Sequence, residues 1–65
     1  MNNNTKLTIY DNNLIIIEDY QNLKYNSNCE IIIDHYMIEG CNLEIVFLDD
    51  YLIKIKGYYE VIRFV

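Results

Sequence analysis

The residues that could carry chemistry in this chain are few, and His35 is the first of them. It stands between Asp34 and Tyr36, where a metal-binding or acid–base role is conceivable. One histidine with no second cluster of ligands falls short of the ligand count that a zinc site requires. A structural or surface role is therefore predicted for His35.

The two cysteines, Cys29 and Cys41, are not spaced as a C-x-x-C motif, so neither redox catalysis nor zinc binding is indicated. A single disulfide between them is left open. The start Met1–Asn4 has neither the basic nor the apolar region of a secretory signal, and no secretory signal is expected. Outside a secretory compartment two cysteines are expected to be buried or free thiols.

The adjacent acids Asp49 and Asp50 form a carboxylate pair, and such a pair in a hairpin is interpreted as a solvated turn. The sequence shows no nucleophile beside a base and no phosphate-binding loop. No enzymatic activity, catalytic residue, metal or cofactor is therefore predicted.

The length and the charge of the chain limit the remaining classes of function. The 65 residues suffice for one domain, and the net charge of −5 argues against nucleic acid, whose phosphates require clustered Lys and Arg. No run reaches the ~20 apolar residues of a membrane-spanning helix. Residues 1–50 carry nine acids and two lysines, whereas residues 51–65 carry three cations and one acid. These opposite signs suit pairing between copies, or they are ordinary solvated faces.

The composition favours strands, because 12 isoleucines and seven tyrosines pack well on a pleated surface. Asp19–Tyr25 could instead hold one helical turn. Residues 1–5 are predicted to be a frayed lead, and residues 6–65 a single β domain. The expected strands are Lys6–Tyr10, Leu14–Glu18, Leu23–Tyr25, Cys29–Asp34, Met37–Glu39, Leu43–Phe47, Leu52–Lys56 and Tyr58–Val65.

A repeat organises the second half of the chain. Ile38 to Phe47 and Ile55 to Phe64 both read I-x-G-x4-I-x-F, 17 residues apart, and a weaker echo begins at Ile9. Gly40 and Gly57 are predicted structural turns, with positive φ or a close backbone approach. The fold predicted is all-β: a small meander or roll, or a short solenoid-like stack, of about seven short strands.

Alternation of apolar and polar residues predicts which side chains are inside. One buried face is expected to hold Leu43, Ile45, Phe47, Ile53, Ile55, Ile62 and Phe64, joined by Ile9 and Ile16. A second apolar face is expected opposite it, formed by Ile15, Ile17, Ile32, Val46 and Val61. This face, or the terminal strand Tyr58–Val65 as an unpaired edge, is the candidate interface of a homo-oligomer.

Several segments together resemble a known family. They are the opening Leu7–Asn13, the segments Leu14–Tyr20 and Glu30–Ile33, the stretch Ile38–Ile45 with its I-x-G-x-x-L-x-I pattern, and the ending from Leu52 through Gly57 to Val65. In this order they resemble the YabP/YqfC family of sporulation proteins, and YqfC more than YabP. Departures are Asp11 in place of a glycine, the extra Tyr58-Tyr59 and a shorter N-terminal lead, which puts in doubt any partner contact made by the lead.

The resemblance implies a non-enzymatic sporulation protein of endospore-forming bacteria. Such a protein would be a small structural or assembly module at the forespore outer membrane or spore coat, located in the mother-cell cytoplasm. It would self-associate or dock on a membrane partner similar to YqfD, with no membrane span of its own. The alternative is a small ligand- or peptide-binding β-module unrelated to sporulation.

Overall fold

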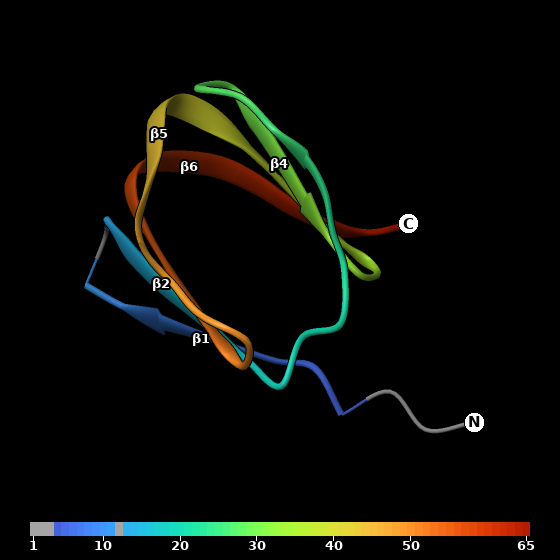
Figure 1. The fold of residues 1–65 in the computed structure, drawn as a ribbon. Coiled ribbons are helices and arrows are strands. Elements are labelled where there is room, and N and C mark those ends of the chain that lie inside the picture. The colour runs from blue at the N-terminus through green and yellow to red at the C-terminus, as the bar shows by residue number, and fades with distance from the viewer. Residues whose placement is uncertain (1–3, 12) are drawn as a thin grey trace.

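Six antiparallel strands make up the computed structural model, which describes residues 4–11 and 13–65 (Figure 1). They are β1 (Lys6–Tyr10), β2 (Leu14–Glu18), β3 (Leu23–Asn26), β4 (Glu30–Ile33), β5 (Tyr36–Leu48) and β6 (Leu52–Phe64). The described residues contain no helix that could cross a membrane. The all-β prediction is confirmed, and the helical turn considered at Asp19–Tyr25 is wrong. There are six strands instead of about seven, because each arm of the last hairpin is one continuous strand.

The strands form one open sheet in the order β1-β2-β6-β5-β4-β3, and every neighbouring pair is antiparallel. Strands β3 to β6 follow one another as a meander, and the β1–β2 hairpin lies beside β6, so shorter strands flank the long β5–β6 hairpin on both sides. The solenoid-like alternative is therefore wrong, because its coils would stack parallel strands.

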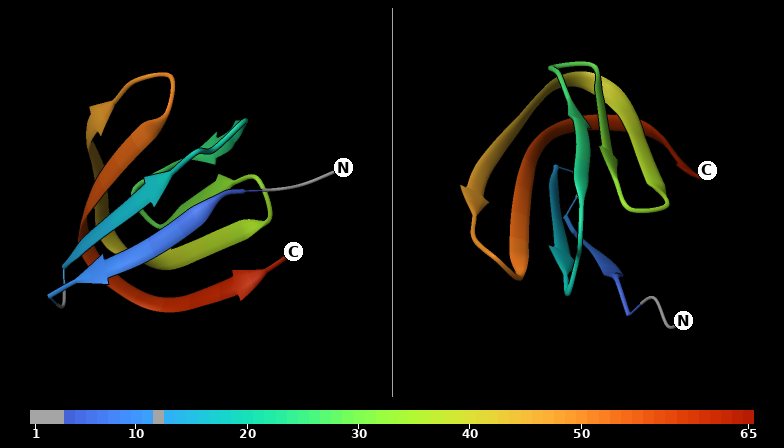
Figure 2. Two further views of the ribbon diagram at one scale, coloured as in Figure 1. Left: turned by 90° about the horizontal axis from the view of Figure 1, so that it is seen from below. Right: turned by 45° about the vertical axis from the view of Figure 1, so that its right-hand side comes forward.

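The long hairpin is sharply bent, and the sheet curls around a central core (Figures 1 and 2). Both glycines of the repeat lie inside the 13-residue strands at this bend. Gly57 has φ 136°, and a Cβ there would meet the backbone of Asn42 and Leu43. A Cβ on Gly40 would meet the carbonyl of Tyr58. Only glycine allows the two backbones to approach so closely.

The two arms of the long hairpin, β5 and β6, pair with their flanking strands in nearly equivalent ways. In β2, Ile15 lies opposite Ile55 of β6; in β4, Ile31 lies opposite Ile38 of β5. Ile38 and Ile55 are the residues that open the two copies of the sequence repeat. The repeat therefore corresponds to an approximate twofold relation between the arms.

Hydrogen bonds at the bend follow the same relation. The N–H of Gly57 donates to the carbonyl of Asn13, just before β2, at 3.1 Å. The N–H of Gly40 donates to the carbonyl of Cys29, just before β4, at 2.9 Å. Beyond these bonds, β2 and β4 cover only one half of β6 and β5, respectively.

The core lies between the two halves of the curled sheet. Its buried residues are Ile15, Ile17, Ile31, Ile33, Ile38, Leu43, Ile53 and Ile55, with Ile45, Ile62 and Tyr59 packed against them. Of the predicted core, Leu43, Ile53 and Ile55 are buried, whereas Phe47 and Phe64 are exposed and that part of the prediction is wrong. Ile9 is also exposed, because β1 is an edge strand, and Ile16 is only half-buried.

The prediction of Phe47 as a core residue fails because of a β-bulge. The register of β5 against β6 shifts between Ile45 and Phe47, so Phe47 pairs with Lys54 and faces outward. The Lys54 ammonium lies 5.5 Å from the centre of the Phe47 ring. Phe64 fails for another reason: it pairs with Tyr36 at the end of the strand, past the last core layer.

Candidate functional site

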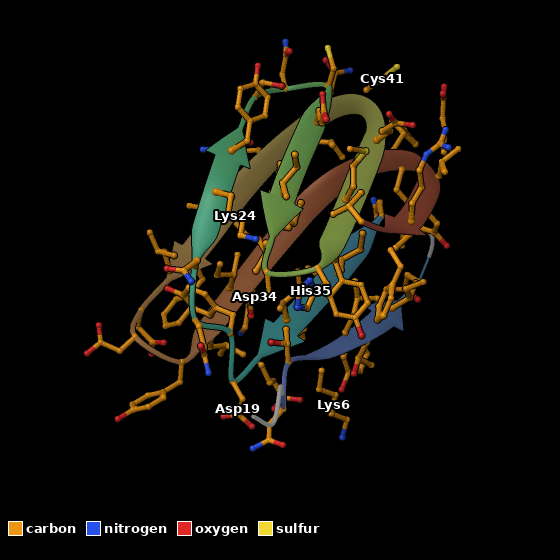
Figure 3. All side chains as sticks on the ribbon, turned by 90° about the vertical axis from the view of Figure 1, so that its right-hand side faces the viewer. Lys6, Asp19, Lys24, Asp34, His35 and Cys41 are labelled. Carbon is orange, nitrogen blue, oxygen red and sulfur yellow. The ribbon has the colours of Figure 1, made fainter. Side chains whose placement is uncertain are left out.

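Asp34 and His35, labelled in Figure 3, form the tight connection between β4 and β5, and they differ in burial. Asp34 has φ 52°, a conformation that Asp tolerates in tight hairpin loops. The Asp34 side chain is buried, whereas that of His35 is exposed. The centre of the His35 ring lies 6.4 Å from the centre of the Phe64 ring. The surface position predicted for His35 agrees with the structure.

The Asp34 carboxylate joins three separate segments. The N–H of Asn22 donates to it at 2.8 Å, and the N–H of Gln21 reaches both of its oxygens at 3.2 and 3.0 Å. The hydroxyl of Thr5 donates to it as well, so Thr5 is anchored although the sequence assigns it to the frayed lead. Residues 1–3 of that lead lie outside the described residues.

The electrostatics of Asp34 follow from these contacts. Burial alone would raise the pKa of its carboxyl, but hydrogen bonds from Thr5, Asn22 and Gln21, with His35 nearby, lower the pKa below its ordinary value. The group is therefore held as a fully hydrogen-bonded anion. This arrangement holds Thr5 and the segment Gln21-Asn22 against the β4–β5 connection.

At the tip of the long hairpin, Asp49 orders the loop to β6. Its carboxylate accepts hydrogen bonds from the N–H groups of Tyr51 and Leu52 at 2.8 and 2.7 Å. The Tyr20 hydroxyl donates to the Asp49 carbonyl. Burial raises the pKa of Tyr20, as do the nearby acids Asp49, Asp50 and Asp34. The carboxylate pair thus belongs to a solvated turn, and Asp49 stabilises it.

The cysteines lie at the opposite end of β4 from Asp34, where Figure 3 labels Cys41. Cys29 and Cys41 are both free and exposed, so the expectation of a free thiol is met and that of a buried one is wrong. Within the part of the chain that the structure describes, no three His, Cys, Asp or Glu side chains gather to hold a metal ion.

The predicted second apolar face is not assembled as one surface. Ile15 and Ile17 are core residues with exposed fractions of 2% and 0%, so this part of the prediction is wrong. The run from Leu14 to Ile17 is apolar throughout, and its pairing with β6 decides which side chains face inward. Ile32 is half-buried on the outer face, whereas Val46 and Val61 are exposed.

The structure instead presents two unpaired strand edges at the bent hairpin. The β5 free edge is Glu44–Leu48, which pairs with β6 on one side only, because β4 pairs with β5 no further than Glu39. The β6 free edge is Tyr58–Phe64, which pairs with β5 only, because β2 pairs with β6 only as far as Lys56. An unpaired terminal strand is predicted from the sequence, whereas its equivalent in β5 is not.

Large apolar side chains are exposed along both edges. On the β5 free edge, Val46, Phe47 and Leu48 are 46%, 44% and 53% exposed. On the β6 free edge, Tyr58 and Phe64 are 66% and 75% exposed. Phe64 packs edge-on against Tyr36 with ring centres 5.1 Å apart, which leaves most of its surface open. Exposed apolar strand edges are a recognised feature of surfaces that pair with other chains.

Comparison with known proteins adds no relative: no family model, curated protein or solved structure matches this chain. The functional interpretation rests on the residues and on the geometry of the two free edges.

Proposed function

We propose that this protein is a non-enzymatic assembly module of the bacterial spore envelope. It acts in the mother-cell cytoplasm, at the forespore outer membrane or the coat, where it self-associates or docks on a membrane partner similar to YqfD. The observation that carries the assembly role is the exposure of apolar side chains along two unpaired strand edges. Strand edges of this kind bind by main-chain hydrogen bonding and need no catalytic group.

The sporulation context is supported by the resemblance to the YabP/YqfC family. The motif residues of that resemblance include Gly40, Gly57 and the isoleucines beside them, and they form the bent hairpin that carries both free edges. The shared pattern therefore concerns the part of the molecule that the assembly role requires.

The alternative function, a small peptide-binding module unrelated to sporulation, would use the same free edges. Localisation distinguishes the two. The chain fused to a fluorescent protein, and expressed in an endospore-forming host, is expected to form a ring around the forespore during engulfment. Unfused fluorescent protein is the control. Diffuse fluorescence at every stage, from a fusion shown to be intact, would overturn the sporulation role.

A further inference from the structure

We propose that copies of this chain join head to tail, the β5 free edge of one copy pairing antiparallel with the β6 free edge of the next. The inference rests on the proposed self-association and names its interface and its partner, which is a second copy of the same chain. It follows from the backbone, the charges and the symmetry of the two edges.

The backbone of both edges offers hydrogen-bonding groups to a new strand. The N–H of Asp49 donates to Leu52 at 3.0 Å, and that of Val65 donates to His35 at 2.8 Å. In an antiparallel ladder the N–H and C=O groups of successive residues point to opposite sides. The preceding residues, Leu48 and Phe64, therefore direct both groups away from the hairpin and toward the free edge.

Leu48 and Phe64 are equivalent under the approximate twofold relation of the hairpin arms, because the bulge between Ile45 and Phe47 brings Leu48, and not Phe47, to the position that matches Phe64. Each lies next to the residue that makes the terminal hydrogen bond, and each is more than half exposed. The hairpin therefore carries one docking position on each arm, on opposite edges of the bent ribbon.

Charge favours the mixed pairing over the pairing of two β5 free edges. The β5 free edge begins at Glu44 and runs into Asp49 and Asp50, so two copies of it would face acids with acids. The β6 free edge carries Glu60 and Arg63, and the Arg63 guanidinium is exposed apart from an ion pair with Glu39 at 3.3 Å. Antiparallel pairing of the two edges places the start of one beside the end of the other, so Glu44 of one copy lies near Arg63 of the next, which favours the mixed pair.

The two remaining edges of the sheet are less suited to pairing. β1 begins with Lys6, and β3 is a four-residue strand that contains Lys24. Short edge strands and edge lysines are the devices by which proteins discourage strand addition. Ile45–Leu48, by contrast, contains no charged residue.

A pairing between two different edges does not close on itself in a pair. Each added copy leaves one β5 free edge and one β6 free edge unfilled, so assembly continues into an open chain or a ring. Such growth would suit a protein that forms a layer over a large surface.

The test uses one blocked edge at a time. Leu48→Pro and Phe64→Pro each remove an outward N–H while sparing the ladder inside the hairpin. Light scattering of the wild-type chain is expected to show a mass that grows with concentration from micromolar to millimolar. Each variant alone is expected to stay at the monomer mass, 7.8 kDa. An equimolar mixture of the two is expected to give twice that mass and no more, since only one intact pair of edges remains.

Threonine variants at the same two positions are the matched controls. Leu48→Thr and Phe64→Thr keep the N–H and are expected to assemble, though less strongly. If Leu48→Pro melts below the wild type, Leu48→Lys replaces it, because its charge would block the same edge. A wild-type monomer at all concentrations, self-association of either proline variant alone, or a mixture that stays monomeric would overturn the proposal. A monomeric chain that still rings the forespore would overturn only this inference and leave the proposed function standing.

Discussion

Asp34→Asn is expected to lower stability through the loss of charge at a buried, hydrogen-bonded position. Asparagine tolerates φ 52° and keeps one carbonyl oxygen, so the backbone and one acceptor are preserved. With the amide oxygen in the place of Oδ1, the bonds from Asn22 and Gln21 become neutral, and the NH2 group at the place of Oδ2 cannot accept the bond from Thr5. Each change costs about 1 kcal/mol. A total near 2 kcal/mol, allowing for partial relaxation, corresponds to a fall of roughly 10 °C in the melting temperature of so small a domain.

The dependence on pH identifies the charge as the cause. The folded pKa of Asp34 is lowered, so its contribution is fully present above the unfolded pKa of about 3.9 and is lost as pH falls through the folded value. The difference between the wild type and Asp34→Asn is therefore expected to be largest at neutral pH and to shrink on acidification below about pH 4.

Thermal unfolding followed by circular dichroism at a series of pH values measures both effects. Asp11→Asn is the matched control, because Asp11 also has a positive φ, 57°, but is exposed. It is expected to melt close to the wild type at neutral pH. Equal melting temperatures for Asp34→Asn and the wild type at neutral pH would refute the reasoning, as would a difference that stays constant at low pH.

Three further outcomes are expected. Gly57→Ala should lower the free energy of unfolding by about 2 kcal/mol, measured by urea titration, because φ 136° strains any L side chain; an unchanged midpoint would contradict this. Ile53→Ala should cost ~2–5 kcal/mol and Phe64→Ala about 1 kcal/mol or less, and equal costs in the same titration would show that the core is misplaced. Cys29 and Cys41 should both be alkylated by a maleimide without denaturant, and mass spectrometry showing an unmodified thiol would contradict their exposure.

The sequence predicts inward-facing residues correctly where polar residues mark the alternation. Lys54 and Lys56 flank Ile55, so the phase of that strand is unambiguous, and Ile53 and Ile55 are buried as expected. Leu14–Ile17 has no polar residue to set its phase, and only the register with β6 turns Ile15 and Ile17 inward. The bulge that reverses Phe47 has no glycine or other local signal in the sequence.

The role of Asp34 could not be predicted from the sequence, for a related reason. The strands expected at Cys29–Asp34 and Met37–Glu39 imply a short connection between them, and the structure has one at Asp34-His35. The partners of the carboxylate, Thr5, Gln21 and Asn22, come from segments that only the curled sheet brings together. Local patterns specify turns, whereas contacts of this range depend on the completed fold.

The bend of the hairpin accounts both for the stability of so short a chain and for its free edges. A straight 13-residue strand would be about 43 Å long, whereas the longest dimension of the molecule is 32 Å. Bending at Gly40 and Gly57 turns one face of the sheet inward, so a single open sheet encloses a core without a disulfide. The same bend means that β2 and β4 each cover only half of an arm, since both strands end where the arm turns away. The unpaired halves of the two arms therefore arise from the same bend by which this chain builds its core.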